Sequence, residues 1–289
     1  MRSEKKIKDI LIFSIKVIAT ILLFYYINKY YTKINFSEFP QINNIGLIFF
    51  IAIIFGFLQQ SLLFLRWKFS VETAGISADK KSLLKSYFIG QFLGTISPAR
   101  SGDIAKIFYL NAPKRQGAFA LILDGAAALL TLFITGLWKI YPQTAETPVL
   151  IADKIISVAG ISSIAVCLIV FVLSKKLKFN KILLTKLFST ALIQHIVLTI
   201  QGAIIFSILL PISFLEASFA VASAYCIMPL IPVIAAIGIR ELSFAFLISA
   251  FISDPSIKPI VFAVSYILLL CNSVIFMLPG IYLFYKSKK

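Results

Sequence analysis

QFLGTISPARSGDIAK, residues 91–106, is the stretch that decides the fold of this chain. It carries one proline, two glycines, two cations and one anion between apolar flanks. A second stretch with the same ingredients, MPLIPVIAAIGIRELS at residues 228–243, lies in the other half of the chain. Charges and broken backbone are costly at membrane depth unless they line a cavity or meet partners. Two such interruptions, one in each half, therefore indicate a transport site.

The composition places both stretches in a membrane protein. The chain has 289 residues, of which 60% are hydrophobic, and its mean hydropathy is +0.95. Several apolar runs approach the roughly 20 residues that cross a bilayer, which predicts an all-α polytopic membrane protein. The net charge of +16 stands in short loops beside apolar runs, so we attribute it to the positive-inside rule and expect no nucleic-acid partner. The three cysteines and single histidine favour neither a disulfide framework nor a metal site, and we expect no cofactor.

The apolar runs divide into full spans and interrupted pairs. Six are long enough to cross the membrane: about 10–27, 45–65, 118–137, 155–173, 187–210 and 259–284. Two pairs of shorter runs, 83–96 with 104–110 and 217–230 with 235–252, meet at proline- and glycine-containing turns. Each pair predicts a re-entrant or broken helical hairpin that enters and leaves on one side.

The order of these elements predicts a single transmembrane domain, 1–289, made of two half-repeats, about 1–143 and 144–289. Each half reads span, span, hairpin, span, and the two halves begin on opposite sides, which is the plan of an inverted repeat. With both termini in the cytoplasm, nineteen of the 28 Lys and Arg fall in cytoplasmic segments and five outside. Arg66, which closes the second span, is counted among the cytoplasmic cations. This bias favours a multi-pass protein of the plasma (inner) membrane in that orientation.

Charged residues on the interrupted stretches are the candidates for binding a substrate. The planar fork of arginine suits phosphate, so Arg100 and Arg240 are expected to hold a lipid headgroup. The carboxylates of Asp103, Asp124 and Glu241 can balance these cations, bind a cationic headgroup or carry a proton. The predicted substrate-binding set is Arg100, Asp103, Lys106, Asp124, Arg240 and Glu241.

Backbone features of the hairpins complete the predicted site. They are assigned to Pro98, Gly102, Pro232 and Gly238. The N-terminal ends of the short helices, at Ser101–Gly102 and after Gly238, are expected to offer backbone N–H donors to an anion. The alternative is that Arg100–Asp103 and Arg240–Glu241 are internal ion pairs that only hold the hairpins in place.

Four further polar side chains lie within apolar runs. Gln194 and His195 stand side by side in the span at 187–210, and Gln201 follows in the same run. Gln91 begins the first interrupted stretch. We expect all four to form hydrogen bonds between helices rather than a proton relay.

These motifs resemble the flippase-like membrane domain of the lysylphosphatidylglycerol synthase family. The resemblance rests on RWK at 66–68, GQFLGTISPARSGDIAKIFYL at 90–110, ALILDG at 120–125 and IPVIAAIGIREL at 231–242. It extends over nearly the whole chain. Two positions differ from the usual family pattern, Gly125 where Arg is common and 235–237 where glycine is more frequent.

The resemblance implies lipid translocation. No soluble stretch has room for the family's aminoacyl-transferase domain, so lysyl transfer is not expected. The expected function is the movement of a phospholipid or lipid-linked intermediate through a polar cavity between the two hairpins. Membrane lipids are the expected ligands. Two alternatives stay open: a membrane-embedded enzyme of lipid-linked glycan or aminoacyl-lipid metabolism, for which no catalytic motif is present, and an accessory subunit of a partner enzyme.

Overall fold

The structure is a computed structural model that describes residues 45–97, 100–136, 180–228, 239–252, 254 and 257–287. Every regular element within these residues is helical. The elements are α2 (Ile45–Thr73), α3 (Lys80–Ile96), the 3-10 turn η2 (Ser101–Ile104), α4 (Ala105–Tyr109), α5 (Lys114–Gly136), α7 (Lys181–Leu209), α8 (Phe214–Ile227), α9 (Ile239–Ile248), α10 (Lys258–Leu269), the π-helical turn η5 (Leu270–Val274) and α11 (Ile275–Lys286). The expected spans at 10–27 and 155–173 and the residues Pro98, Pro232 and Gly238 lie outside the described residues.

Four helices among the described residues are long and apolar enough to cross a membrane: Ile45–Thr73, Lys114–Leu132, Lys181–Leu209 and Lys258–Lys286. Both α2 and α7 have 29 residues, or about 43 Å at 1.5 Å per residue, which exceeds a hydrocarbon core of about 30 Å. The protein is therefore all-helical and membrane-embedded, as the composition predicts.

Two predicted helix ends are wrong. The span expected to end at Leu65 continues through Arg66 and Trp67 to Thr73, because Arg66 meets a carboxylate inside the bundle instead of reaching water. At α7, Asn180 caps the helix by accepting a hydrogen bond from the N–H of Ile182. Two lysines assigned to a loop, Lys181 and Lys186, consequently lie in the first turns of α7.

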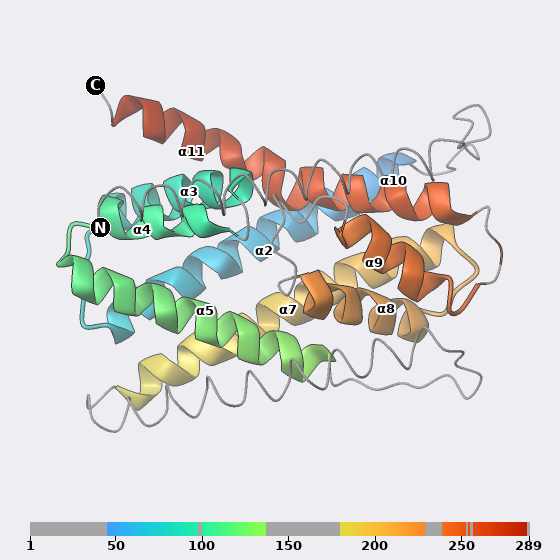
Figure 1. Cartoon of the computed structure of the whole chain (residues 1–289), viewed down its shortest axis with the longest axis horizontal. Helices are drawn as coiled ribbons and strands as arrows, with labels where there is room; N and C mark the ends of the chain where they lie inside the picture. Colours follow the sequence, from blue (N-terminus) through green and yellow to red (C-terminus); the bar gives the residue numbers. More distant parts are fainter. Residues whose placement is uncertain are drawn as a thin grey trace, which may run out of the picture.

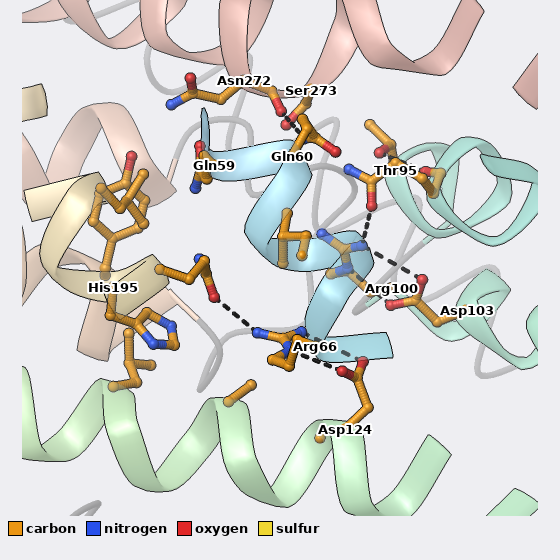
Figure 2. Close-up of a pocket in the computed structure, with 18 of the residues that line it drawn as sticks. Gln59, Gln60, Arg66, Thr95, Arg100, Asp103, Asp124, His195, Asn272 and Ser273 are labelled. Atoms are coloured by element: carbon orange, nitrogen blue, oxygen red, sulfur yellow. Dashed lines mark hydrogen bonds and ion pairs between the residues drawn. The ribbon is translucent and has the colours of Figure 1, made fainter. Parts of the chain in front are cut away.

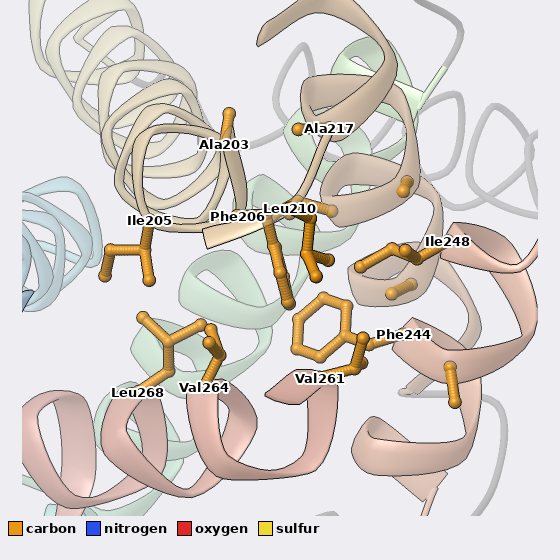
Figure 3. Close-up of a cluster of buried hydrophobic side chains, with 14 of the residues drawn as sticks. Ala203, Ile205, Phe206, Leu210, Ala217, Phe244, Ile248, Val261, Val264 and Leu268 are labelled. Atoms are coloured by element: carbon orange, nitrogen blue, oxygen red, sulfur yellow. The ribbon is translucent and has the colours of Figure 1, made fainter. Parts of the chain in front are cut away.

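The core of the bundle gathers at the crossing of α7, α8, α9 and α10. Phe206 of α7 and Phe244 of α9 pack edge to face with their ring centroids 5.3 Å apart, and Tyr225 of α8 contacts Phe244 in the same way at 5.8 Å. Val261 and Leu268 of α10 close the cluster (Figure 3). This apolar core fixes α9, and with it the position of Arg240, against the long helices.

Two short helical pairs flank the long helices. α3 packs against η2 and α4, and α8 packs against α9; the two pairs lie toward opposite ends of the bundle (Figure 1). Helix α3 has 17 residues and α8 has 14, or about 26 Å and 21 Å, so neither reaches across a 30 Å core alone. The second pair begins at Phe214 rather than Ala217, because Ser213 and Glu216 form a capping box there.

The first pair closes tightly because its contact positions are glycines. A Cβ atom on Gly102 would lie 2.1 Å from the carbonyl oxygen of Leu93. A Cβ on Gly94 would lie 2.6 Å from Oδ1 of Asp103, and one on Gly90 would lie 2.2 Å from Cγ of Lys106. The small residues of α3 thus leave room for two charged side chains of the returning helical arm, η2 and α4.

Candidate functional site

Arg100 and Asp103 lie in one tight turn at the tip of the first hairpin. The Nε of Arg100 is 2.9 Å from Oδ2 of Asp103, and its Nη2 donates to Oε1 of Gln91 at 2.8 Å. The spacing of three residues in a 3-10 turn brings the two side chains together. Arg100 keeps 49% of its side chain exposed, so part of its guanidinium remains open to a ligand.

The backbone of Arg100 has an unusual conformation. Its φ of 54° and ψ of 28° place it in the left-handed region, and it is the only described residue other than glycine with a positive φ. That conformation costs a residue with a Cβ roughly 1–2 kcal/mol. A strained arginine at a hairpin tip is a candidate for function, since glycine would fit the backbone better.

The hairpin does not offer all of the backbone donors expected at Ser101–Gly102. The N–H of Gly102 donates to Oγ of Ser97 at 2.6 Å, and the N–H of Asp103 donates to the carbonyl of Arg100. These two donors close the turn and are not free for an anion, which corrects that prediction.

Lys106 joins the first hairpin to α5. Its Nζ lies 3.6 Å from Oδ1 of Asp103 and 3.6 Å from Oδ2 of Asp124, and it stands 5.1 Å from the centre of the Trp67 ring. Lys106 is only 4% exposed. A buried ammonium is tolerated here because two carboxylates and an aromatic face surround it.

Arg66 is the functional candidate that sequence reasoning missed. Its Nε is 2.7 Å from Oδ1 of Asp124 and its Nη1 donates to Oε1 of Gln194 at 2.8 Å. It was assigned to a cytoplasmic loop, but it is buried where α2, α5 and α7 meet. Two signals point to it in retrospect: no Gly or Pro ends the helix before Gly75, and Asp124 within a span requires a cation.

Arg240 and Glu241 form the second charged group. The Nη2 of Arg240 is 2.7 Å from Oε1 of Glu241, and its Nε donates to Oγ of Ser265 at 2.8 Å. The Ser265 hydroxyl in turn donates to the same carboxylate oxygen at 3.0 Å. Both charged side chains are buried, at 6% and 0% exposure. The first turn of α9 is thereby tied to α10.

One cavity of about 590 Å³ brings both charged groups together. Its lining includes Arg100 of the first hairpin and Arg240 of α9, although 140 residues separate them in the chain. Asp103, Lys106, Asp124 and Arg66 also line it, whereas Glu241 lies behind Arg240 and does not. Figure 2 shows the Arg66, Arg100, Asp103 and Asp124 side chains directed toward this shared space. A volume of this size is within the range of small-molecule sites, about 300–1,000 Å³.

A network of amides forms another part of the wall. The Tyr87 hydroxyl donates to Oε1 of Gln60 at 2.6 Å, and the Gln60 amide donates to the carbonyl of Asn272. Asn272 and Gln201 exchange two side-chain hydrogen bonds, at 2.8 and 2.9 Å. The π-helical turn at Leu270–Val274 contributes Asn272, in keeping with the frequent occurrence of such turns at functional sites.

Three of the four polar residues expected to connect helices do so, and Gln91 instead ties α3 to the turn of the same hairpin. Gln194 accepts from Arg66, Gln91 accepts from Arg100, and Gln201 pairs with Asn272. The Nδ1 of His195 lies 2.9 Å from Oγ1 of Thr131, joining α7 to α5. The prediction of hydrogen bonds between helices is therefore confirmed for Gln194, His195 and Gln201, whereas Gln91 bonds within the first hairpin.

The comparison with protein families decides the relationship. Residues 11–275 match the model described as "Lysylphosphatidylglycerol synthase TM region". The chain belongs to this family. No curated protein and no solved structure matches it. Membership of the lysylphosphatidylglycerol synthase TM family confirms the resemblance drawn from the motifs and makes this a lipid-related membrane protein. The cavity is lined by Arg100, Asp103 and Lys106 of the first motif and by Arg240 of the second.

Proposed function

We propose that this protein moves a phospholipid or lipid-linked intermediate across the membrane in which it is embedded. The observation that carries the proposal is the single cavity lined by Arg100 and Arg240. An arginine fork binds phosphate oxygens in two parallel hydrogen bonds, and each of these arginines has donor capacity beyond its ion pair. The headgroup passes through the cavity while the acyl chains stay in the bilayer.

The charges around the cavity support a substrate rather than a purely structural role. Desolvating a charged side chain costs several kcal/mol, and ion pairs return that cost only with excellent geometry. Apolar residues of similar size would stabilise a bundle at least as well. Four cations lining an open cavity of about 590 Å³ are better explained by an anionic ligand than by stability.

The proposed mechanism uses the two short pairs as re-entrant hairpins that enter from opposite faces and meet beside the cavity. The chain forms an inverted repeat in the inner membrane with both termini in the cytoplasm. The protein acts as a transporter and not as an enzyme. Because the sequence contains no ATP-binding motif, transport runs down a gradient or is coupled to an ion gradient.

Labelling of single cysteines tests this topology. Lys81 is exposed in the first turn of α3, and Pro211 is exposed just before α8. Each is changed to cysteine in a protein whose three native cysteines are replaced by serine or alanine. An impermeant maleimide added to intact cells is expected to label position 211 and to leave position 81 unlabelled until the membrane is permeabilised. Labelling of both positions from the same side contradicts the inverted arrangement.

A leaflet-exchange assay tests translocation. Purified protein is reconstituted into liposomes holding a tail-labelled fluorescent phospholipid, and an impermeant quencher reports movement between leaflets. Arg240→Lys keeps the charge facing Glu241 but loses the fork, so we expect the rate to fall about tenfold, the equivalent of one lost charge-assisted hydrogen bond. Arg115→Lys, at an exposed position of α5, is the matched control and is expected to leave the rate unchanged.

The wild-type result decides between the proposal and its alternatives. Protein-dependent movement lost in Arg240→Lys supports translocation through the cavity. No movement of any lipid by folded wild-type protein overturns the proposal, in favour of a membrane enzyme or a subunit that requires a partner enzyme. Equal rates for wild type and Arg240→Lys remove Arg240 from the substrate path.

A further inference from the structure

Every described carboxylate in or beside the cavity already has a cationic partner. Asp103 contacts Arg100 at 2.9 Å and Lys106 at 3.6 Å. Asp124 contacts Arg66 at 2.7 Å and Lys106 at 3.6 Å. Among the described residues that line the cavity, none supplies a carboxylate without a cation beside it.

The charges of this group leave an excess of one cation. Four cations line the cavity, namely Arg66, Arg100, Lys106 and Arg240. Against them stand two lining carboxylates and Glu241 behind Arg240, three in all. With histidine neutral, the net charge is +1, which matches the single negative charge of a phosphodiester. A positive charge entering with the headgroup would meet repulsion from this excess and would find no unpaired carboxylate among the described lining residues.

Beside its charged groups and many apolar side chains, the wall of the cavity contains a set of uncharged amides and hydroxyls. In Figure 2, Gln59, Gln60, Asn272 and Ser273 lie together, apart from the Arg66–Asp124 and Arg100–Asp103 pairs. Gln59 is 6% exposed, and its Oε1 has no hydrogen-bond partner among the described residues. Buried polar atoms are rarely left unsatisfied, so this acceptor is expected to receive a donor from a ligand. Hydroxyl groups donate to amide oxygens without adding charge.

We propose that the cavity selects a phosphodiester headgroup with an uncharged, hydroxyl-bearing substituent such as glycerol and rejects one that carries an aminoacyl ammonium. This inference rests on the proposed lipid translocation and names its substrate class. The phosphate lies among the arginines and Lys106, and the hydroxyl groups reach Gln59 and its neighbours. This preference excludes lysylphosphatidylglycerol, the lipid in the family's name, as the favoured substrate of this protein.

The test compares phosphatidylglycerol with lysyl-phosphatidylglycerol, both carrying the same fluorescent acyl chain, in the leaflet-exchange assay. Wild-type protein is expected to move phosphatidylglycerol at least about tenfold faster, because its described lining residues supply no free counter-ion for the two ammonium groups of the lysyl ester. Gln59→Glu supplies an unpaired carboxylate, so the preference is expected to shrink to about equal rates. Gln59→Leu removes the amide and is expected to slow phosphatidylglycerol while leaving lysyl-phosphatidylglycerol unchanged.

Gln116 is the matched control, because it is exposed on α5 and does not line the cavity. Gln116→Glu and Gln116→Leu are expected to leave both rates at the wild-type value. Soluble glycerophosphoglycerol, added at millimolar concentration, distinguishes a lipid from a free phosphodiester. We expect it to compete weakly and to undergo no uptake; its transport in place of lipid movement would overturn the assignment of a lipid.

The outcomes separate this inference from the proposed function. Movement of neither lipid contradicts translocation itself, and the inference with it. Equal rates in wild-type protein, or faster movement of the lysyl lipid, overturn the selectivity while translocation stands. A preference for phosphatidylglycerol that Gln59→Glu does not change assigns the selectivity to other residues and overturns the role given to Gln59.

Discussion

Arg66→Leu is expected to lower the free energy of unfolding by about 3–5 kcal/mol, the largest stability effect we predict for a single residue of the site. Arg66 is buried, and its removal leaves the Asp124 carboxylate with only the longer contact to Lys106 and leaves the Gln194 amide oxygen without its donor. An uncompensated buried carboxylate accounts for most of the loss. The measurement is thermal or denaturant unfolding of the protein in detergent, followed by size-exclusion recovery.

Two further variants show whether the charge is responsible. Lys68→Met removes a neighbouring cation of the same helix. Because its Nζ lies 3.8 Å from Oε1 of Glu72 and both side chains are partly exposed, the change is expected to lower the free energy of unfolding by less than about 1 kcal/mol. Arg66→Leu combined with Asp124→Leu removes both partners and is expected to be less destabilising than the sum of the single changes. Additive losses would mean that packing, and not the buried pair, explains the effect.

Arg100→Gly is expected to abolish most lipid translocation while leaving stability within about 1 kcal/mol of the wild-type value. Glycine adopts the φ of 54° without strain, which offsets the loss of a half-exposed ion pair with Asp103. Loss of the guanidinium removes two charge-assisted hydrogen bonds to phosphate, equivalent to about a hundredfold in rate. The two readouts are unfolding in detergent and leaflet exchange in liposomes.

Arg100→Ala separates backbone strain from side-chain function. It removes the same guanidinium but keeps a Cβ in the left-handed region, so it is expected to be about 1 kcal/mol less stable than Arg100→Gly and equally slow in transport. If Arg100→Gly transports lipid at the wild-type rate, Arg100 serves only to hold the hairpin. In that case the ion-pair interpretation of the Arg100–Asp103 contact is correct.

Short-range parts of the site were predictable from the sequence. Arg100 and Asp103 are three residues apart in a turn, and Arg240 and Glu241 are adjacent, so each pair forms within one helical turn. The position of the first break also follows from local chemistry, because Pro98 interrupts an apolar run and favours a turn, although Pro279 inside α11 shows that a proline does not end every helix. The helical class and the four described spans depend on hydropathy alone.

Long-range pairings could not be predicted in this way. A soluble helix marks its buried face by polarity, but α2 is apolar on both faces: Phe50 and Phe57 are 62% and 57% exposed, whereas Ile48 is fully buried. Lipid tails and protein cores are equally apolar, so hydropathy does not show which face packs. For that reason Arg66 was placed in a loop, and its contact with Asp124, 58 residues away, was not foreseen.

The sequence by itself determined that this is a helical membrane protein of the lysylphosphatidylglycerol synthase TM family, where its helices break, and which charges sit at the breaks. Only the tertiary structure decided that Arg100 and Arg240 line one cavity and that Arg66 neutralises Asp124. It also showed that Gln59 lines the same cavity and that its buried Oε1 has no hydrogen-bond partner among the described residues. The physical reason is distance along the chain. Local spacing and composition specify helices and turns, whereas the packing of apolar helices specifies which distant polar groups meet.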